Sequence, residues 1–319
     1  MLAELPEPDT MTTPALIALD WGTSNLRASL LDGGGRVLQT RSASGGVMAV
    51  QGGAFAGALR AVCGEWLRQF SCPLIASGMI GSRQGWKEAP YVDCPAAIGP
   101  LSTQLTSVPL AGGALEHDAR VLHIVPGLRC IDSSGQFDVM RGEETQIWGA
   151  GLAPGSICVL PGTHSKWAWL GANGDITRFH TFMTGELYAL LTQHGILGRL
   201  MVFGHKNTDD FVAGARLGLA GQAQLSHTIF AARSAGLMGQ VTPEGLPDFL
   251  SGILIGAEIG AALAAHADRS VCLLGDDALC SRYELACEVA AVSTSRAVAG
   301  ATTTGQWLVA RAAGLLTAP

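Results

Sequence analysis

The first chemistry-bearing stretch of the chain is a turn between two apolar segments, 16–21 and 26–32. A tight turn with glycine and hydroxyl side chains presents N–H and O–H donors to phosphate oxygens. Asp20 is placed to hold a hydrated Mg²⁺, because Mg²⁺ takes one or two carboxylates together with phosphate oxygens. An ordinary hairpin turn is the alternative, since Asp and Gly are common turn residues. The candidates for binding phosphate and metal are Asp20, Gly22, Thr23, Ser24, Asn25 and Arg27, with Asp20 as the metal ligand.

A second turn repeats this chemistry and adds a cation. At a shift of 140 residues, Gly22-Thr23 falls on Gly162-Thr163, and Ala28, Leu30 and Gly34 fall on Ala168, Leu170 and Gly174. This repetition predicts two similar halves, although two unrelated hairpins also fit so short a motif. If the two turns face each other, they bind a polyphosphate from both sides. The candidates in the second turn are Gly162, Thr163, His164, Ser165 and Lys166.

Acidic residues gather between the turns, in the segment 138–146. One carboxylate among Asp138, Glu143 and Glu144 is suited to accept the proton of an attacking hydroxyl, and Arg141 to offset phosphoryl charge. Acids at a helix N-terminus are also ordinary dipole partners, which is the alternative interpretation.

Apolar periodicity predicts the elements around these residues. We expect strands at 16–21, 26–32, 37–40, 73–77 and 121–125, and helices at 55–69 and 141–148. A strand near 271–274 runs into Gly275 and then into a helix. The apolar stretch 250–265 carries Glu258 and is shorter than the ~20 residues of a bilayer span, which favours a buried core helix.

Composition excludes several classes of protein. Hydrophobic residues make up 48% and charged residues 14% of the 319 residues, which excludes intrinsic disorder. The net charge of −6 gives no global cationic surface for nucleic acid. The eight cysteines are dispersed and no signal peptide is recognisable, so we expect reduced thiols and a cytoplasmic location. The native start is either Met1 or Met11.

Taken together, these motifs resemble a known enzyme family. LDWGTSNLR, GMIGSRQGW, YVDCPA, DVMRGEETQIWGA, LPGTHSKWAWL and LLGDDALCSRYELA are similar to the 2-dehydro-3-deoxygalactonokinase family, of the actin/Hsp70/sugar-kinase superfamily. The resemblance covers about residues 14–316. It implies an α/β fold with two ribonuclease-H-like (actin-like ATPase) domains and an active-site cleft between them. It also implies ATP-dependent, Mg²⁺-dependent phosphorylation of 2-dehydro-3-deoxy-D-galactonate at its 6-hydroxyl.

The resemblance also implies roles for segments. Residues 20–27 and 160–170 resemble the two phosphate segments, 138–148 the first connecting helix, 273–283 with Gly275 the adenosine segment, and 300–315 the closing helix. Where many relatives carry an aspartate at the start of the second phosphate segment, this chain has Leu160-Pro161.

The same resemblance assigns the base and the substrate contacts. The superfamily favours Asp138 narrowly as the base, with Glu143 or Glu144 as the alternative. The loop 78–96 supplies the sugar contacts. Arg83 is expected to face the substrate carboxylate, because a guanidinium binds it in a bidentate manner. The further substrate candidates are Gln84, Lys87 (the alternative to Arg83) and Asp93, which is expected to bind sugar hydroxyls.

The predicted organisation is a leader at 1–13, an N-terminal domain at 14–150 and a C-terminal domain at 151–319. Expected partners are ATP and a sugar acid, with no nucleic acid and no membrane, and a homodimer is left open. Two other functions stay open: a kinase of another sugar or sugar acid, and a non-catalytic actin-like ATP-binding protein.

Overall fold

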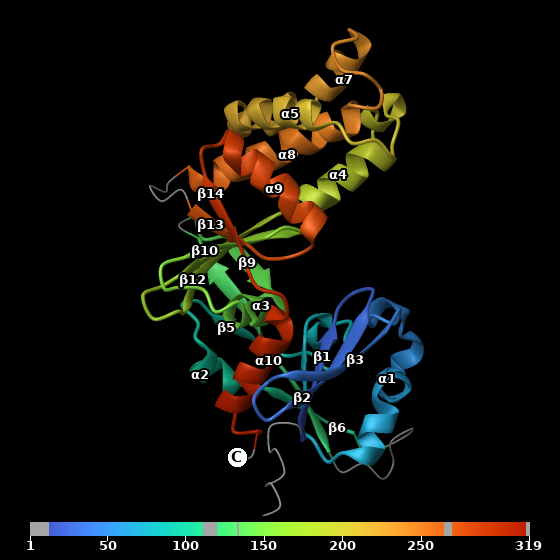
Figure 1. The fold of residues 1–319 in the computed structure, drawn as a ribbon, viewed down its shortest axis with the longest axis vertical. Helices are drawn as coiled ribbons and strands as arrows, with labels where there is room; N and C mark the ends of the chain where they lie inside the picture. The colour runs from blue at the N-terminus through green and yellow to red at the C-terminus, as the bar shows by residue number, and fades with distance from the viewer. Residues whose placement is uncertain (1–12, 111–119, 133, 265–269, 317–319) are drawn as a thin grey trace, which may run out of the picture. The chain divides into compact units, whose positions relative to one another are not determined.

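The computed structural model describes residues 13–110, 120–132, 134–264 and 270–316. These residues form two compact units, each built around a mixed β-sheet (Figure 1). Unit 1 holds the chain up to residue 152, together with 173–177 and the segment from 298 onward. Unit 2 holds 153–172 and 178–297. The predicted leader, 1–13, lies outside the described residues except for Thr13.

The main sheet of unit 1 has the strand order β3-β2-β1-β4-β7-β6. β2 is antiparallel to β1 and β3, whereas β4 is parallel to β1 and β7. Residues 16–19 of β1 are buried, as expected for a central strand covered on both faces. The strands are β1 (Pro14–Trp21), β2 (Leu26–Asp32), β3 (Val37–Ala43), β4 (Leu74–Ser77), β6 (Thr106–Pro109) and β7 (Val121–Ile124).

A smaller sheet and the helices complete unit 1. Helix α1 buries the predicted face of Leu59, Val62, Cys63 and Trp66 in the core of the main sheet. The small sheet has the order β5 (Tyr91–Asp93), β8 (Gly127–Ile131) and β9 (Phe137–Met140). The helices are α1 (Phe55–Gln69), α2 (Ile98–Ser102), α3 (Glu143–Gly149) and α10 (Ala301–Ala312), with 3₁₀ turns η1 (Val47–Ala49), η2 (Gln51–Gly53) and η3 (Met79–Gly81).

Unit 2 repeats the topology of unit 1. Its sheet has the order β12-β11-β10-β13-β14, and β10 is antiparallel to β11 but parallel to β13. The strands are β10 (Ile157–Leu160), β11 (Ser165–Leu170), β12 (Ile176–Phe182), β13 (Ser270–Leu273) and β14 (Ser293–Arg296). The helices are α4 (Thr184–Gln193), α5 (Thr208–Ala220), α6 (Leu225–Thr228), α7 (Ala231–Leu237), α8 (Leu246–Leu263) and α9 (Asp277–Val289), with η5 (Leu197–Leu200) and η6 (Gln222–Gln224).

The two sheets share the strand order of a ribonuclease-H-like domain, in which the first strand pairs antiparallel with the second and parallel with a later strand on its other side. The strands related by the predicted shift occupy equivalent places, since β1, β2 and β3 correspond to β10, β11 and β12. The two similar halves and the α/β fold of two ribonuclease-H-like domains, both predicted from the sequence, are therefore confirmed.

The domain prediction differs from the structure at the C-terminal segment. The expected range 151–319 includes α10, but the segment from 298 onward groups with unit 1. The reason is a close helix crossing: a Cβ atom on Gly149 of α3 would lie 1.8 Å from the carbonyl oxygen of Ala301. A Cβ atom on Gly305 of α10 would lie 1.7 Å from the carbonyl oxygen of Thr145. Figure 1 shows the two helices next to each other. The segment 173–177 also groups with unit 1, where Ala96 and Ile176 exchange backbone hydrogen bonds.

One helix of the described residues, α8, is long and apolar enough to cross a membrane, and 78% of it is buried inside the protein. Core helices of soluble proteins meet the same condition. The predicted buried helix is therefore confirmed.

Candidate active site

The first turn is held in place by the segment that follows β3. The Trp21 indole N–H donates to the carbonyl of Gly45 at 3.2 Å. The N–H groups of residues 46, 47 and 48 donate to the carbonyls of Ser24, Gly22 and Thr23 at 3.0, 3.0 and 3.2 Å. Within the described part of the chain, the N–H groups of Thr23, Ser24 and Asn25 have no protein acceptor. The turn therefore presents free donors, as a phosphate site requires.

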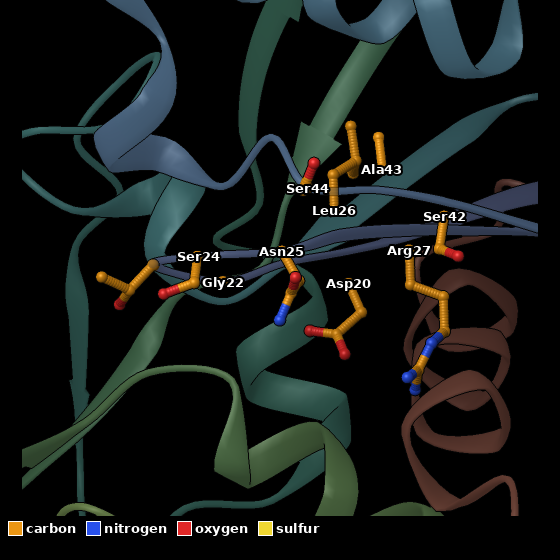
Figure 2. A pocket seen from close by; sticks show the side chains of 10 residues that line it. Asp20, Gly22, Ser24, Asn25, Leu26, Arg27, Ser42, Ala43 and Ser44 are labelled. Atoms are coloured by element: carbon orange, nitrogen blue, oxygen red, sulfur yellow. The ribbon is translucent and has the colours of Figure 1, made fainter.

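A pocket of about 590 Å³ lies at this turn and is lined by Asp20, residues 22–27 and residues 42–44. Figure 2 shows the Asp20 carboxylate between the side chains of Asn25 and Arg27. Burial raises the pKa of Asp20, and the Arg27 charge lowers it. No described group donates a hydrogen bond to this carboxylate. An open carboxylate beside phosphate-binding donors fits a hydrated Mg²⁺.

Glycines bring the start of α3 close to Asp20. A Cβ atom on Gly78 (φ +95°) would lie 3.8 Å from Oδ1 of Asp20 and 2.9 Å from the carbonyl oxygen of Trp21. A Cβ atom on Gly142 (φ +108°) would in turn lie 3.0 Å from the Cα atom of Gly78. Both glycines combine a positive φ with a close approach that a side chain would block. Glu143, the first residue of α3, therefore comes directly after Gly142, whose backbone lies close to Gly78 beside Asp20.

The two glutamates at the start of α3 differ in environment. Glu143 is half-buried, and its Oε2 accepts a hydrogen bond from the N–H of Arg141 at 2.9 Å. Glu144 is buried, and its Oε2 accepts one from the N–H of Gly142 at 2.7 Å, while its Oε1 has no partner. Burial and the Glu143 charge raise the pKa of Glu144 to about 8. Glu144 is therefore neutral at pH 7, and Glu143 is the one of the two that solvent reaches.

The raised pKa of Glu144 predicts a pH dependence of stability. Between pH 4.5 and about 8 the folded chain keeps a proton on Glu144 that the unfolded chain releases. The free energy of unfolding therefore falls as pH rises through this window. We expect Glu144→Gln to remove that part of the fall, so that the variant gains stability relative to wild type between pH 5 and pH 8. Urea unfolding of both proteins at pH 5 and pH 8 tests this. If the difference in unfolding free energy between the variant and wild type is the same at both pH values, the prediction is wrong.

Asp138 and Arg141 lie in the small sheet and just beyond it. Asp138 pairs with Cys130 in the β8–β9 ladder, and its Oδ1 accepts a hydrogen bond from the N–H of Val139 at 2.8 Å. Arg141 is 9% exposed, stacks on the Tyr91 ring at 4.3 Å and donates to the carbonyl of Ala89 at 2.8 Å. The guanidinium thus supports the loop 78–96. Its role in offsetting phosphoryl charge stays a prediction.

The predicted substrate residues are all exposed on or beside that loop. Arg83 is 86% exposed and pairs with Glu88 at 3.1 Å. Lys87 donates to the carbonyl of Ser107 at 3.0 Å, and Gln84 is exposed. Asp93 forms an ion pair with Arg129, whose hydrogen bonds lower the pKa of Asp93. Arg83 is therefore available to a ligand, whereas the Asp93 carboxylate is already bound by a cation.

The second turn, in unit 2, lies against the start of α4. The N–H of Glu186 donates to the carbonyl of Thr163 at 3.0 Å, and the Glu186 carboxylate contacts the ring of His164. Gly162, Thr163 and His164 are accessible, as a phosphate site requires. Ser165 and Lys166 are buried, with the hydroxyl of Ser165 bonded to Glu258 and the ammonium of Lys166 bonded to Thr181. The structure therefore turns these two predicted phosphate ligands inward.

A pocket of about 280 Å³ lies beside the second turn. Gly162 and Thr163 form one wall, and the other walls come from α4, α8 and α9. These walls contribute Thr184, Gly185, Tyr188, Ser251, Leu254, Ile255, Leu279, Arg282 and Tyr283. The lining combines apolar and aromatic side chains with a few polar groups, which is typical of a small-molecule site.

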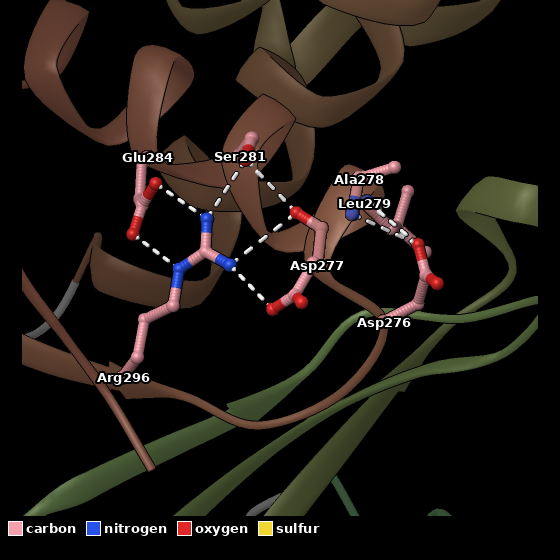
Figure 3. Close-up of polar contacts among 7 residues, drawn as sticks. All are labelled: Asp276, Asp277, Ala278, Leu279, Ser281, Glu284 and Arg296. Atoms are coloured by element: carbon pink, nitrogen blue, oxygen red, sulfur yellow. Dashed lines mark hydrogen bonds and ion pairs between the residues drawn. The ribbon is translucent and has the colours of Figure 1, made fainter. Parts of the chain in front are cut away.

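The predicted adenosine segment forms the turn before α9. A Cβ atom on Gly275 would lie 3.5 Å from the carbonyl oxygen of Pro161, which precedes the second turn. Asp276 caps α9 by accepting from the N–H groups of Ala278 and Leu279 at 3.0 and 3.1 Å (Figure 3). Asp277 pairs with Arg296 at 2.9 Å. The acids of this segment thus fix the turn, and Gly275 lies next to the second phosphate turn.

Comparison with known proteins identifies the family. The family model of 2-keto-3-deoxy-galactonokinase matches residues 20–309. The chain belongs to this family. The 2-dehydro-3-deoxygalactonokinase of Escherichia coli K12 is 38% identical over 289 residues, which cover 88% of this chain and 94% of that protein. A crystal structure of a Sinorhizobium meliloti protein assigned as the same kinase has a TM-score of 0.79 and 32% identity, and covers 93% of this chain and 98% of the other.

Sequence reasoning missed several residues that shape the site of this family member. Gly78 and Gly142 bring α3 to Asp20, and the segment 45–48 orients the first turn. The sequence shows these glycines, but it does not show their contacts, which join segments far apart in the chain. Glu258 lies beside the second turn, and its signal was a lone acid within an apolar helix.

Proposed function

We propose that this protein transfers the γ-phosphoryl group of ATP to the 6-hydroxyl of 2-dehydro-3-deoxy-D-galactonate, in the catabolism of galactonate. Membership of the kinase family over residues 20–309 carries this proposal. The free N–H groups of the first turn and the open carboxylate of Asp20 supply the phosphate and metal chemistry that such a reaction needs. We place the enzyme in the cytoplasm, in keeping with eight cysteines that form no disulfide.

Each unit has its own part in binding ATP. In unit 1, the N–H groups of the first turn bind oxygens of the transferring phosphoryl group, and Arg27 adds a positive charge at the same pocket. Asp20 would hold Mg²⁺, which neutralises phosphate charge when bound. In unit 2, the second turn binds phosphate oxygens through Gly162 and Thr163, and the adjoining pocket accepts the nucleoside.

We propose Glu143 as the general base, in place of the narrowly preferred Asp138. Oxygen O6 of the sugar acid forms a bond to the γ-phosphorus, while the bond from that phosphorus to the bridging oxygen of ADP breaks. The hydroxyl proton passes to the Glu143 carboxylate. Glu143 is accessible and follows Gly142, which lies against Gly78 beside Asp20. Asp138 instead pairs with Cys130 in the β8–β9 ladder.

Recognition of the substrate carboxylate is assigned to Arg83. We expect Arg83→Met to raise the KM for the sugar acid about ten- to hundredfold, the usual effect of losing a charged hydrogen-bond partner. The KM for ATP should change little. Steady-state kinetics with each substrate varied in turn tests this assignment. Glu88→Gln, which removes only the exposed partner of Arg83, is the matched control. Equal effects on both KM values would indicate a general defect and contradict the assignment.

An ADP-release assay with a panel of acceptors tests the function itself. The panel holds 2-dehydro-3-deoxy-D-galactonate, its gluconate epimer, D-galactonate and neutral hexoses, and ³¹P NMR of the product locates the new phosphate ester. We expect the highest kcat/KM with 2-dehydro-3-deoxy-D-galactonate and a 6-phosphate product. A higher value with another acceptor would favour a kinase of a different sugar or sugar acid. ATP binding without any phosphorylated product would favour the non-catalytic alternative.

A further inference from the structure

Glu258 joins four elements of unit 2 through one buried carboxylate. It lies in the middle of α8 and is 3% exposed. Its Oε1 accepts hydrogen bonds from the Ser165 hydroxyl and the Trp167 indole N–H, both at 2.7 Å. Its Oε2 accepts from the hydroxyls of Tyr283, at 2.8 Å, and Thr184. All four lone-pair positions of the carboxylate are therefore used, two on each oxygen.

The donors come from the elements that form the pocket beside the second turn. Ser165 follows this turn directly, Thr184 begins α4, and Tyr283 lies in α9. Thr184 and Tyr283 line the pocket themselves, whereas Glu258 is not among the lining residues. Glu258 thus acts on the pocket only through the groups that it binds.

Helix α8 gives this carboxylate a fixed position. Gly252 and Gly256 press α8 against α5, since Cβ atoms on them would lie 2.1 and 2.2 Å from the carbonyl oxygens of Phe211 and Ala215. At such a separation the two helix backbones are in direct contact, and neither can slide without a clash. The Glu258 carboxylate on this helix therefore holds the second turn, α4 and α9 in one arrangement.

We infer that Glu258 is a positioning residue for nucleotide binding: it sets the second turn and the walls of the adjoining pocket in the geometry that accepts ATP. The inference rests on the proposed function, because it takes the nucleotide as the ligand of this pocket. Glu258 acts through hydrogen-bond geometry and not through its charge. A glutamine can serve the same four partners, because its carbonyl accepts from Ser165 and Trp167 while its amide group donates to the hydroxyls of Thr184 and Tyr283.

Calorimetry with Mg·ADP and, separately, with 2-dehydro-3-deoxy-D-galactonate tests the inference. We expect Glu258→Met to weaken Mg·ADP binding about ten- to hundredfold, since all four donors lose the acceptor that they share. Sugar-acid binding should stay unchanged, and Glu258→Gln should bind Mg·ADP nearly as well as wild type. Glu288→Met, on the exposed part of α9, is the matched control and should bind both ligands like wild type.

Ser165→Ala keeps the inference testable if Glu258→Met fails to fold. This small change removes the hydrogen bond from Ser165 to Glu258 and the contact of the same hydroxyl with the Tyr283 hydroxyl, at 3.1 Å, while the other three donors to Glu258 remain. We expect about fivefold weaker Mg·ADP binding. Wild-type affinity for Mg·ADP in Ser165→Ala, or in a folded Glu258→Met protein, would overturn the inference. A loss of sugar-acid binding in either variant as large as the loss of Mg·ADP binding would overturn it too. If Glu258→Gln loses as much Mg·ADP affinity as Glu258→Met, then Glu258 acts through its charge and not through hydrogen-bond geometry. If the wild-type protein binds the sugar acid but no Mg·ADP, the proposed function fails first, and the inference fails with it.

Discussion

Asp20→Asn is expected to lower kcat at least about a hundredfold, because the Mg²⁺ that Asp20 would hold supplies several kcal/mol of charge stabilisation in the transition state. Asparagine keeps the size of the side chain but loses the charge that would hold Mg²⁺ beside the free N–H groups of the first turn. The substitution also removes a carboxylate whose pKa burial raises, so the folded state should lose no stability at pH 7. Steady-state kinetics at saturating Mg²⁺ and thermal unfolding measure the two effects separately.

Asp209→Asn provides the control for this change, because Asp209 is exposed in the first turn of α5. The control should keep wild-type kcat. Near-wild-type kcat in a folded Asp20→Asn protein would exclude Asp20 as the metal ligand. A fall in kcat accompanied by a lower melting temperature would instead indicate that Asp20 mainly supports the fold.

Glu143→Gln is expected to lower kcat by about 10²–10⁴-fold, the range of general-base catalysis. The amide cannot take the proton of the attacking hydroxyl, but it keeps the length of the side chain, so sugar-acid affinity should be preserved. Positioning of the hydroxyl contributes to this loss, because phosphoryl-transfer transition states are loose. Kinetics for kcat and calorimetry for sugar-acid affinity make the comparison.

Asp138→Asn and Glu144→Gln are the matched variants for this prediction. Both make the same chemical change within six residues of Glu143, and both should have smaller effects on kcat. Asp138 lies in the β8–β9 ladder, and Glu144 is buried and neutral at pH 7. If Asp138→Asn is the most damaging of the three, Asp138 is the base and Glu143 only caps the backbone before α3.

Local sequence patterns predicted most of the regular elements. The apolar periodicity of 55–69 predicted α1. The repeat at residues 22 and 162 predicted two similar halves, and their sheets have the same strand order. These signals are local, because strand alternation, helical spacing and turn glycines act within a few residues of one another. The grouping of α10 with unit 1 was not predicted, because it depends on the contact of Gly149 with a segment about 150 residues later.

The sequence predicted which residue types form the candidate site better than it predicted how they are oriented. The first turn has the expected donors, and Gly162, Thr163 and His164 are accessible as predicted. The sequence did not show that Ser165 and Lys166 point into unit 2, since the donor types alone are the same in either orientation. It also left the base open, because the contact between Gly78 and Gly142 joins segments about sixty residues apart.

The position of α10 bears on how the enzyme is made in the cell. Gln306 of this helix donates to the carbonyl of Leu19, next to Asp20, at 2.7 Å and to the Ser77 hydroxyl, next to Gly78, at 2.8 Å. The ribosome synthesises α10 after all of unit 2, so the strand ends that carry the Asp20 site lack this partner until then. Unit 1 therefore gains its last helix only after residues 298 onward have been synthesised. A chain that ends before residue 298 lacks the Gln306 contacts beside the Asp20 site, so we expect it to release no ADP in the kinase assay.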